Sequence, residues 1–253
     1  MFFDSTRNQT TMKRFLVPAL LVVVCVYAGR AIYHRHLETR LLQTWPDSEA
    51  QDPQQLRFAA AVAVPAMAKH CAGCHGADLR GDSHKGSPNL IDKEWIHGEG
   101  SVADIEQTIN YGIRSGDHRG RDLADTPGFE LPVPYRRYQI ASLQPADIHD
   151  LVEFILQLNH REPIDPAAAA HGALLYRTAL CFDCHNGDAT GDPSIGAPPL
   201  TPHAWLYGDG SRDTLSDIIA YGRRGICPAW FGRLDSVTIR AMALYLHDRS
   251  GPS

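Results

Sequence analysis

The sequence predicts a mainly helical protein in which one N-terminal membrane helix precedes two similar domains. An internal repeat indicates the two domains, because residues of the second half match those 110 positions earlier. The last segment of each copy, 148–155 and then 239–246, carries apolar residues at helical spacing. The N-terminal helix is indicated by the apolar run 15–29.

Residues 1–40 are predicted to be a signal anchor with a transmembrane helix. The run Phe15–Gly29 is shorter than the ~20 residues that span a bilayer, but Arg30 can snorkel and residues 31–33 extend the segment. A removed signal peptide, with Ala28 before the cut, is the alternative. Basic residues ahead of the run place the N-terminus in the cytoplasm, so we expect the rest of the chain in the periplasm.

The domain boundaries follow from the repeat and from composition. A polar tether occupies 41–55, and the first domain occupies 56–160. A short hinge, 161–166, leads to the second domain at 167–253. Within the domains, we expect helices before both cysteine motifs, and short helices capped by Ser101 and Ser211.

A Cys-x-x-Cys-His motif heads each copy, at 71–75 (CAGCH) and 181–185 (CFDCH). Two thiols on one helical turn can bond to the vinyl groups of a haem while the next imidazole reaches the iron, so each motif predicts covalent c-type haem attachment. A redox-active pair or half a zinc site would not need the histidine, nor occur twice. The predicted attachment cysteines are Cys71, Cys74, Cys181 and Cys184, and the predicted axial histidines are His75 and His185.

Charge is unevenly distributed along the chain. The net charge is −5, but residues 1–40 are basic, so the exported part is left with 18 basic and 27 acidic residues. Such a surface makes nucleic acid an unlikely partner and suits docking on a basic patch of a redox protein, although simple solubility also explains it.

The tandem pattern CAGCHG…GSPNL…W…YG and CFDCHN…GAPPL…WLYG…YGRRG-x-x-PAW resembles the membrane-anchored dihaem cytochrome c subunit of cbb-type haem-copper oxidases. The resemblance covers roughly residues 56–249 and is looser in the first copy after Gly112. It implies an all-α fold of two tandem class I cytochrome c domains with two covalently bound haems. It also implies electron transfer from a donor cytochrome or dehydrogenase to an acceptor such as the oxidase in the inner membrane.

The chain departs from this family at the second axial ligand of each iron, which is a methionine before a proline in the family. Cys227 and Thr126 stand at the matching positions. We expect Cys227 to pair with His185 as the ligands of the second haem, the alternative being a small buried cysteine beside an open iron. For the first haem, ligation by His118 and an open or weakly ligated iron are both retained, since threonine is a poor ligand.

The resemblance also implies residues around each haem. Pro88 and Pro198 are expected to accept a hydrogen bond from the proximal histidines through their carbonyls. Candidates to contact haem propionates are Trp95, Trp205, Tyr111, Tyr221, Arg114, Arg223 and Arg224, with core packing equally open for the aromatic residues.

Function is predicted to be non-enzymatic electron transfer. Two alternatives are a haem enzyme, because thiosulfate dehydrogenases also pair a haem with cysteine, and a sensor that binds NO or CO at an open haem. Against the enzyme alternative, the sequence shows no cluster of acidic, basic or anion-binding residues beyond the arginines already named.

Overall fold

The computed structural model of the chain describes residues 6–122, 143–161, 165–179 and 181–251. These residues form helices and isolated bridges but no strand, which confirms the mainly helical prediction. The helices are α1 (Thr6–Gln43), the 3-10 helix η1 (Pro46–Gln51), α2 (Pro53–His70), α3 (Ala72–His75), α4 (Val102–Tyr111), α5 (Pro145–Leu158), α6 (Pro166–Thr178), α7 (Cys181–His185), α8 (Arg212–Tyr221) and α9 (Ser236–Ser250).

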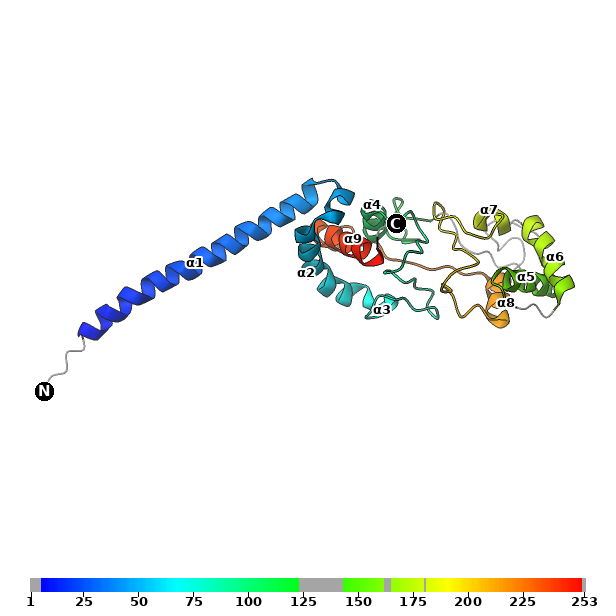
Figure 1. Cartoon of the computed structure of the whole chain (residues 1–253), viewed down its shortest axis with the longest axis horizontal. Helices are drawn as coiled ribbons and strands as arrows, with labels where there is room; N and C mark the ends of the chain where they lie inside the picture. Colours follow the sequence, from blue (N-terminus) through cyan, green and yellow to red (C-terminus); the bar gives the residue numbers. More distant parts are fainter. Residues whose placement is uncertain (1–5, 123–142, 162–164, 180, 252–253) are drawn as a thin grey trace.

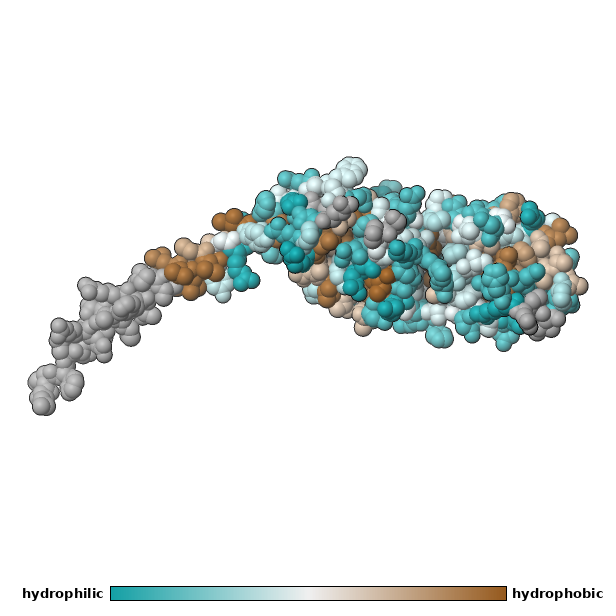
Figure 2. Space-filling view, viewed as in Figure 1, coloured by the Kyte–Doolittle hydropathy of each residue, from teal (hydrophilic) through white to brown (hydrophobic). Residues whose placement is uncertain are grey.

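Helix α1 projects from the rest of the molecule as a single long rod (Figure 1). Towards its C-terminal end, Leu37 and Leu41 are buried against the globular part. Further back, the segment 20–26 exposes large apolar side chains, seen as the brown surface on α1 in Figure 2. Among the residues described, no helix reaches the combination of length and apolarity that crossing a membrane requires.

The predicted caps of the short helices are present. The Ser101 hydroxyl accepts the Asp104 amide at 3.1 Å, and the Ser211 hydroxyl accepts the Thr214 amide at 3.4 Å. Each cap satisfies one backbone donor that has no partner inside the helix, and so fixes where α4 and α8 begin.

Two lobes make up the globular part, and each has its own apolar core. The first lobe consists of α2, α3, α4 and α9, and the second lobe consists of α5, α6, α7 and α8 (Figure 1). In the first core, Phe58 and Met67 of α2 and Ile105 of α4 pack with the apolar stripe of α9. In the second core, the stripe of α5 packs with Tyr176 of α6 and Leu215 of α8.

The lobes are not the two copies of the sequence repeat, because each copy gives its last helix to the other lobe. Helix α5 ends the first copy but packs on α6 and α8, whereas α9 ends the second copy but packs on α2 and α4. The boundaries 56–160 and 167–253 therefore describe the repeat in sequence, and the packing divides the helices differently. This is a helix exchange within one chain, analogous to domain swapping between protomers.

One ion pair joins each exchanged helix to the lobe that receives it. Glu153 of α5 is fully buried and accepts from Arg212 of α8 at 2.7 Å. Arg240 of α9 is paired with Glu106 of α4 at 2.6 Å. Without the exchange, the two partners of each pair would lie in different lobes. Removing the partner of a buried charge is strongly destabilising, so these pairs favour the exchanged arrangement.

The loops between the lobes contact each other with approximate two-fold symmetry. The Gly98 amide donates to the Pro193 carbonyl at 3.0 Å, and the Gly208 amide donates to the Ser83 carbonyl at 3.0 Å, which are pairs related by the 110-residue offset. In the same way, the His97 ring lies against Gly196, and the Tyr207 ring lies against Gly86. The internal repeat thus forms an interface between its own two copies.

Candidate functional site

The first cysteine motif begins where α2 ends. Cys71 caps α2, and α3 then carries Cys74 and His75 around one turn. The His75 Nδ1 lies 2.9 Å from the Pro88 carbonyl, which holds the imidazole in one orientation with Nε2 left for another ligand. Burial lowers the pKa of His75, against the opposing effect of the Pro88 hydrogen bond.

The second motif repeats this geometry on α7. The His185 Nδ1 lies 2.9 Å from the Pro198 carbonyl, and burial again lowers the pKa of the imidazole. Each histidine also accepts a backbone bond at its carbonyl, from Gly81 at 2.8 Å and from Gly191 at 3.0 Å. The two histidine–proline contacts expected from the sequence are therefore present in the structure.

One continuous cavity of about 970 Å³ connects the two motifs across the interface between the lobes. Its first end is lined by Cys71, Cys74 and His75, and its second end by Cys181, Cys184 and His185. Apolar side chains of both cores complete the walls. The residues fit a covalently attached haem at each end, since each end has two thiols, one imidazole oriented by a proline carbonyl, and apolar surroundings.

The structure brings only some of the expected pocket residues to this cavity. Trp95, Trp205, Arg114 and Arg223 line it together with both prolines. Three other candidates are not among the residues that line the cavity. Tyr111 packs on Phe231 and under the Arg119 guanidinium, Tyr221 is 59% exposed, and Arg224 lies 3.7 Å from Asp122.

His118 does not reach the cavity. It lies on a surface turn in which Asp117 binds Arg119, and its side chain is 91% exposed. The structure therefore does not position His118 to ligate the first haem. The other residue considered there, Thr126, lies outside the described residues.

Cys227 lies beside the first motif, whereas the predicted pairing is with His185 of the second motif. Its amide donates to the Ile113 carbonyl at 3.0 Å, at the end of α4. Burial, and secondarily the neighbouring Cys74 thiol, raise the pKa of Cys227 to about 11. The physical reason is the helix exchange, because Cys227 precedes α9 and α9 belongs to the first lobe.

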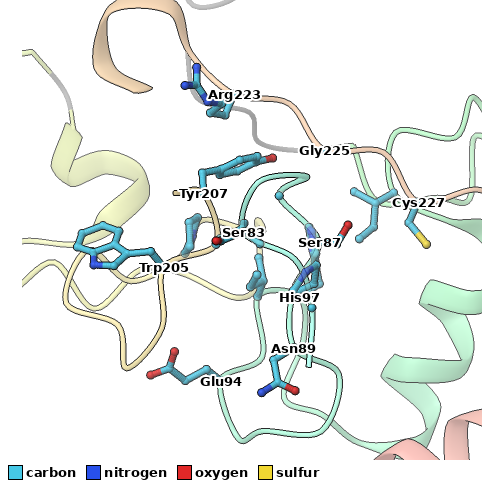
Figure 3. A pocket seen from close by; sticks show the side chains of 18 of the residues that line it. Ser83, Ser87, Asn89, Glu94, His97, Trp205, Tyr207, Arg223, Gly225 and Cys227 are labelled. Carbon is cyan, nitrogen blue, oxygen red and sulfur yellow. The ribbon is translucent and has the colours of Figure 1, made fainter. Parts of the chain in front are cut away.

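Two residues that the sequence analysis did not single out, His97 and Tyr207, occupy the middle of the cavity (Figure 3). Burial, then the charges of Arg121 and Arg114, lower the pKa of His97 to about 4. Burial raises the pKa of Tyr207, opposed by Arg114 and Arg223. A signal was available in the sequence, since both residues follow the aligned tryptophans by two positions and precede the aligned glycines.

The comparisons with known proteins agree with this geometry. Residues 61–159 match the family described as cytochrome c, and residues 167–246 match the family described as subunit III of cbb3-type cytochrome c oxidase.

Several subunits of cbb3-type cytochrome c oxidases align with most of the chain, including both copies of the repeat. The chain is 39% identical to the cbb3-type cytochrome c oxidase subunit FixP of Bradyrhizobium sp. over 79% of its own length and 64% of the relative. It is 37% identical to subunit CcoP of Azospirillum brasilense, over 88% of the chain and 72% of the relative, and 32% identical to CcoP of Cereibacter sphaeroides, over 85% and 69%. The chain thus spans slightly less than two thirds of the first of these proteins.

Proposed function

Because the chain belongs to the FixP/CcoP family of cbb3-type cytochrome c oxidase subunits, we propose that it relays single electrons through two covalently bound haems. The observation that carries this proposal is the single cavity that joins the two haem-attachment motifs. Two cofactors attached at its ends would lie within one cavity of the same protein. Such an arrangement suits electron transfer from one haem to the next.

The roles of the protein groups follow from their positions. The haems supply the one-electron chemistry when bound. Cys71 and Cys74 would hold one haem by thioether bonds, and His75 would ligate its iron in the orientation set by Pro88. The equivalent residues on α7 serve the other. Arg114 and Arg223 line the cavity, where they could neutralise haem propionates.

A membrane-bound oxidase is the proposed acceptor, and a donor cytochrome or dehydrogenase supplies the electrons. The names of the relatives and the acidic exported part support this assignment. We place the lobes in the periplasm, with α1 as a single-pass anchor in the inner membrane. The apolar run 15–29, and the exposed apolar side chains from Leu20 to Val26, support the anchor.

The electron-transfer proposal is tested on the full chain produced with its haems attached. Mass spectrometry should give the polypeptide plus two haems, and a redox titration should give two one-electron transitions. Added to membranes that contain a cbb3 oxidase lacking its own dihaem subunit, the protein should restore oxygen consumption. A chain with no haem or one haem, or with no effect on respiration, would contradict the proposal. Reduction by thiosulfate, or reversible CO binding that controls a partner, would favour the enzyme or sensor alternatives.

The anchor is tested by a charge placed within the apolar segment. Val23→Arg should release the protein from membranes on alkaline extraction, because a central arginine costs about 2.5–3.5 kcal/mol in a membrane helix. Leu42→Arg is the matched control, since Leu42 is also exposed on α1 but lies beyond the apolar segment. Equal retention of both variants would rule out the anchor.

A further inference from the structure

We propose that Cys227, carried by the second copy of the repeat, is the distal iron ligand of the first haem, opposite His75. The inference deepens the proposed function and rests on it, since it requires a haem on Cys71 and Cys74. In this proposal, the first copy of the repeat attaches the haem, and the second copy provides the second ligand of its iron.

The backbone around Cys227 is fastened to the end of α4. Ile113 and Cys227 exchange two hydrogen bonds, from the Ile113 amide at 2.9 Å and from the Cys227 amide at 3.0 Å. The Arg114 Nε donates to the Gly225 carbonyl. Gly112 is required beneath this contact, since it has a φ of +75° and any Cβ there would overlap the Cys227 carbonyl. The segment 225–227 is therefore held to the first lobe before α9 begins.

A second attachment lies on the other side of Cys227. The Trp230 amide donates to the Ile109 carbonyl at 3.0 Å, and the Trp230 ring meets the His70 ring edge-on at 4.8 Å. His70 directly precedes the first attachment cysteine. Cys227 is thus fixed between α4 and the end of α2 (Figure 3). Its side chain lines the cavity, as do Cys74 and His75.

The chemistry of the side chain suits the position. The resemblance in sequence puts Cys227 where the family has its methionine ligand, and the structure decides which haem that position serves. On ligation the thiol proton would pass to solvent, and Sγ would donate an electron pair to ferric iron with no net electron transfer. A thiolate favours the ferric state, so the first haem would have a lower reduction potential than a haem with a methionine ligand.

The test uses EPR and absorption spectra of the ferric, haem-loaded full chain. The wild type should give one low-spin thiolate signal, which Cys227→Ser should abolish and Cys227→Met should replace by the spectrum of a methionine ligand. Cys25→Ser is the matched control, because Cys25 is an exposed cysteine of α1 outside the cavity. To assign the haem, Cys181→Ala/Cys184→Ala should keep the signal, and Cys71→Ala/Cys74→Ala should lose it.

NMR of the paramagnetic full-length protein makes the assignment independent of whether these variants fold. The Cys227 β protons should show contacts to the thioether protons of Cys71 and Cys74. Contacts to the haem on Cys181 and Cys184, or a thiolate signal that survives only in Cys71→Ala/Cys74→Ala, would overturn the assignment. A wild type with both haems attached but unchanged by Cys227→Ser would refute ligation while leaving the electron-transfer proposal intact. Absence of attached haem would instead refute the proposed function itself.

Discussion

The interface between the lobes predicts a large effect of adding one methyl group at Gly86. This glycine has a φ of +66°, and a Cβ built on it would overlap the ring of Tyr207 from the other copy. The left-handed conformation alone costs a non-glycine residue about 1–2 kcal/mol. Forcing a methyl group into an occupied space adds about 1–3 kcal/mol. Gly86→Ala should therefore lower the free energy of unfolding by roughly 2–5 kcal/mol.

A matched control isolates the part due to the interface. Gly232 has a φ of +74° but has no atom within 4 Å of its would-be Cβ, so Gly232→Ala should show the conformational cost alone. The remaining difference of about 1–3 kcal/mol corresponds to a melting temperature about 2–12 °C lower for Gly86→Ala.

Thermal unfolding of the haem-loaded protein in detergent, followed by circular dichroism, measures this difference. A double variant, Gly86→Ala with Tyr207→Ala, should be more stable than the sum of the two single effects implies, because the overlapping ring is gone. Equal melting temperatures of Gly86→Ala and Gly232→Ala would show that the Gly86–Tyr207 contact does not hold the lobes together.

Two further predictions concern charges. Arg212→Ala should lower the free energy of unfolding far more than Lys85→Ala, because Arg212 is the cation paired with the buried Glu153, whereas Lys85 pairs with Asp82 at the surface. Similar losses of the two variants in chemical denaturation would contradict the role of the buried pair. Stability should fall as the pH drops from 6.5 towards 4, because the His97 imidazole binds a proton less readily in the folded state than in the unfolded state. The loss should be about 2 kcal/mol by pH 5. His97→Gln should remove this loss when melting is compared at pH 7 and pH 5, and an unchanged pH profile would exclude His97 as its source.

The sequence by itself determined the local features of the site. The two motifs, the caps at Ser101 and Ser211, and the contacts of His75 and His185 with Pro88 and Pro198 depend on residues close together in the chain. Short-range spacing is enough to predict such features. The buried stripes of α5 and α9 were also evident, because helical periodicity depends only on neighbouring residues.

Only the tertiary structure decided in which lobe the apolar stripes of α5 and α9 are buried. In a repeat, the last helix of either copy offers a similar apolar face, so the hydrophobic pattern permits both the exchanged and the unexchanged arrangement. The choice depends on long-range pairs, Glu153 with Arg212 and Arg240 with Glu106, whose partners lie 59 and 134 residues apart in sequence. Because Cys227 precedes the exchanged helix α9, that same choice moves it from the second motif to the first.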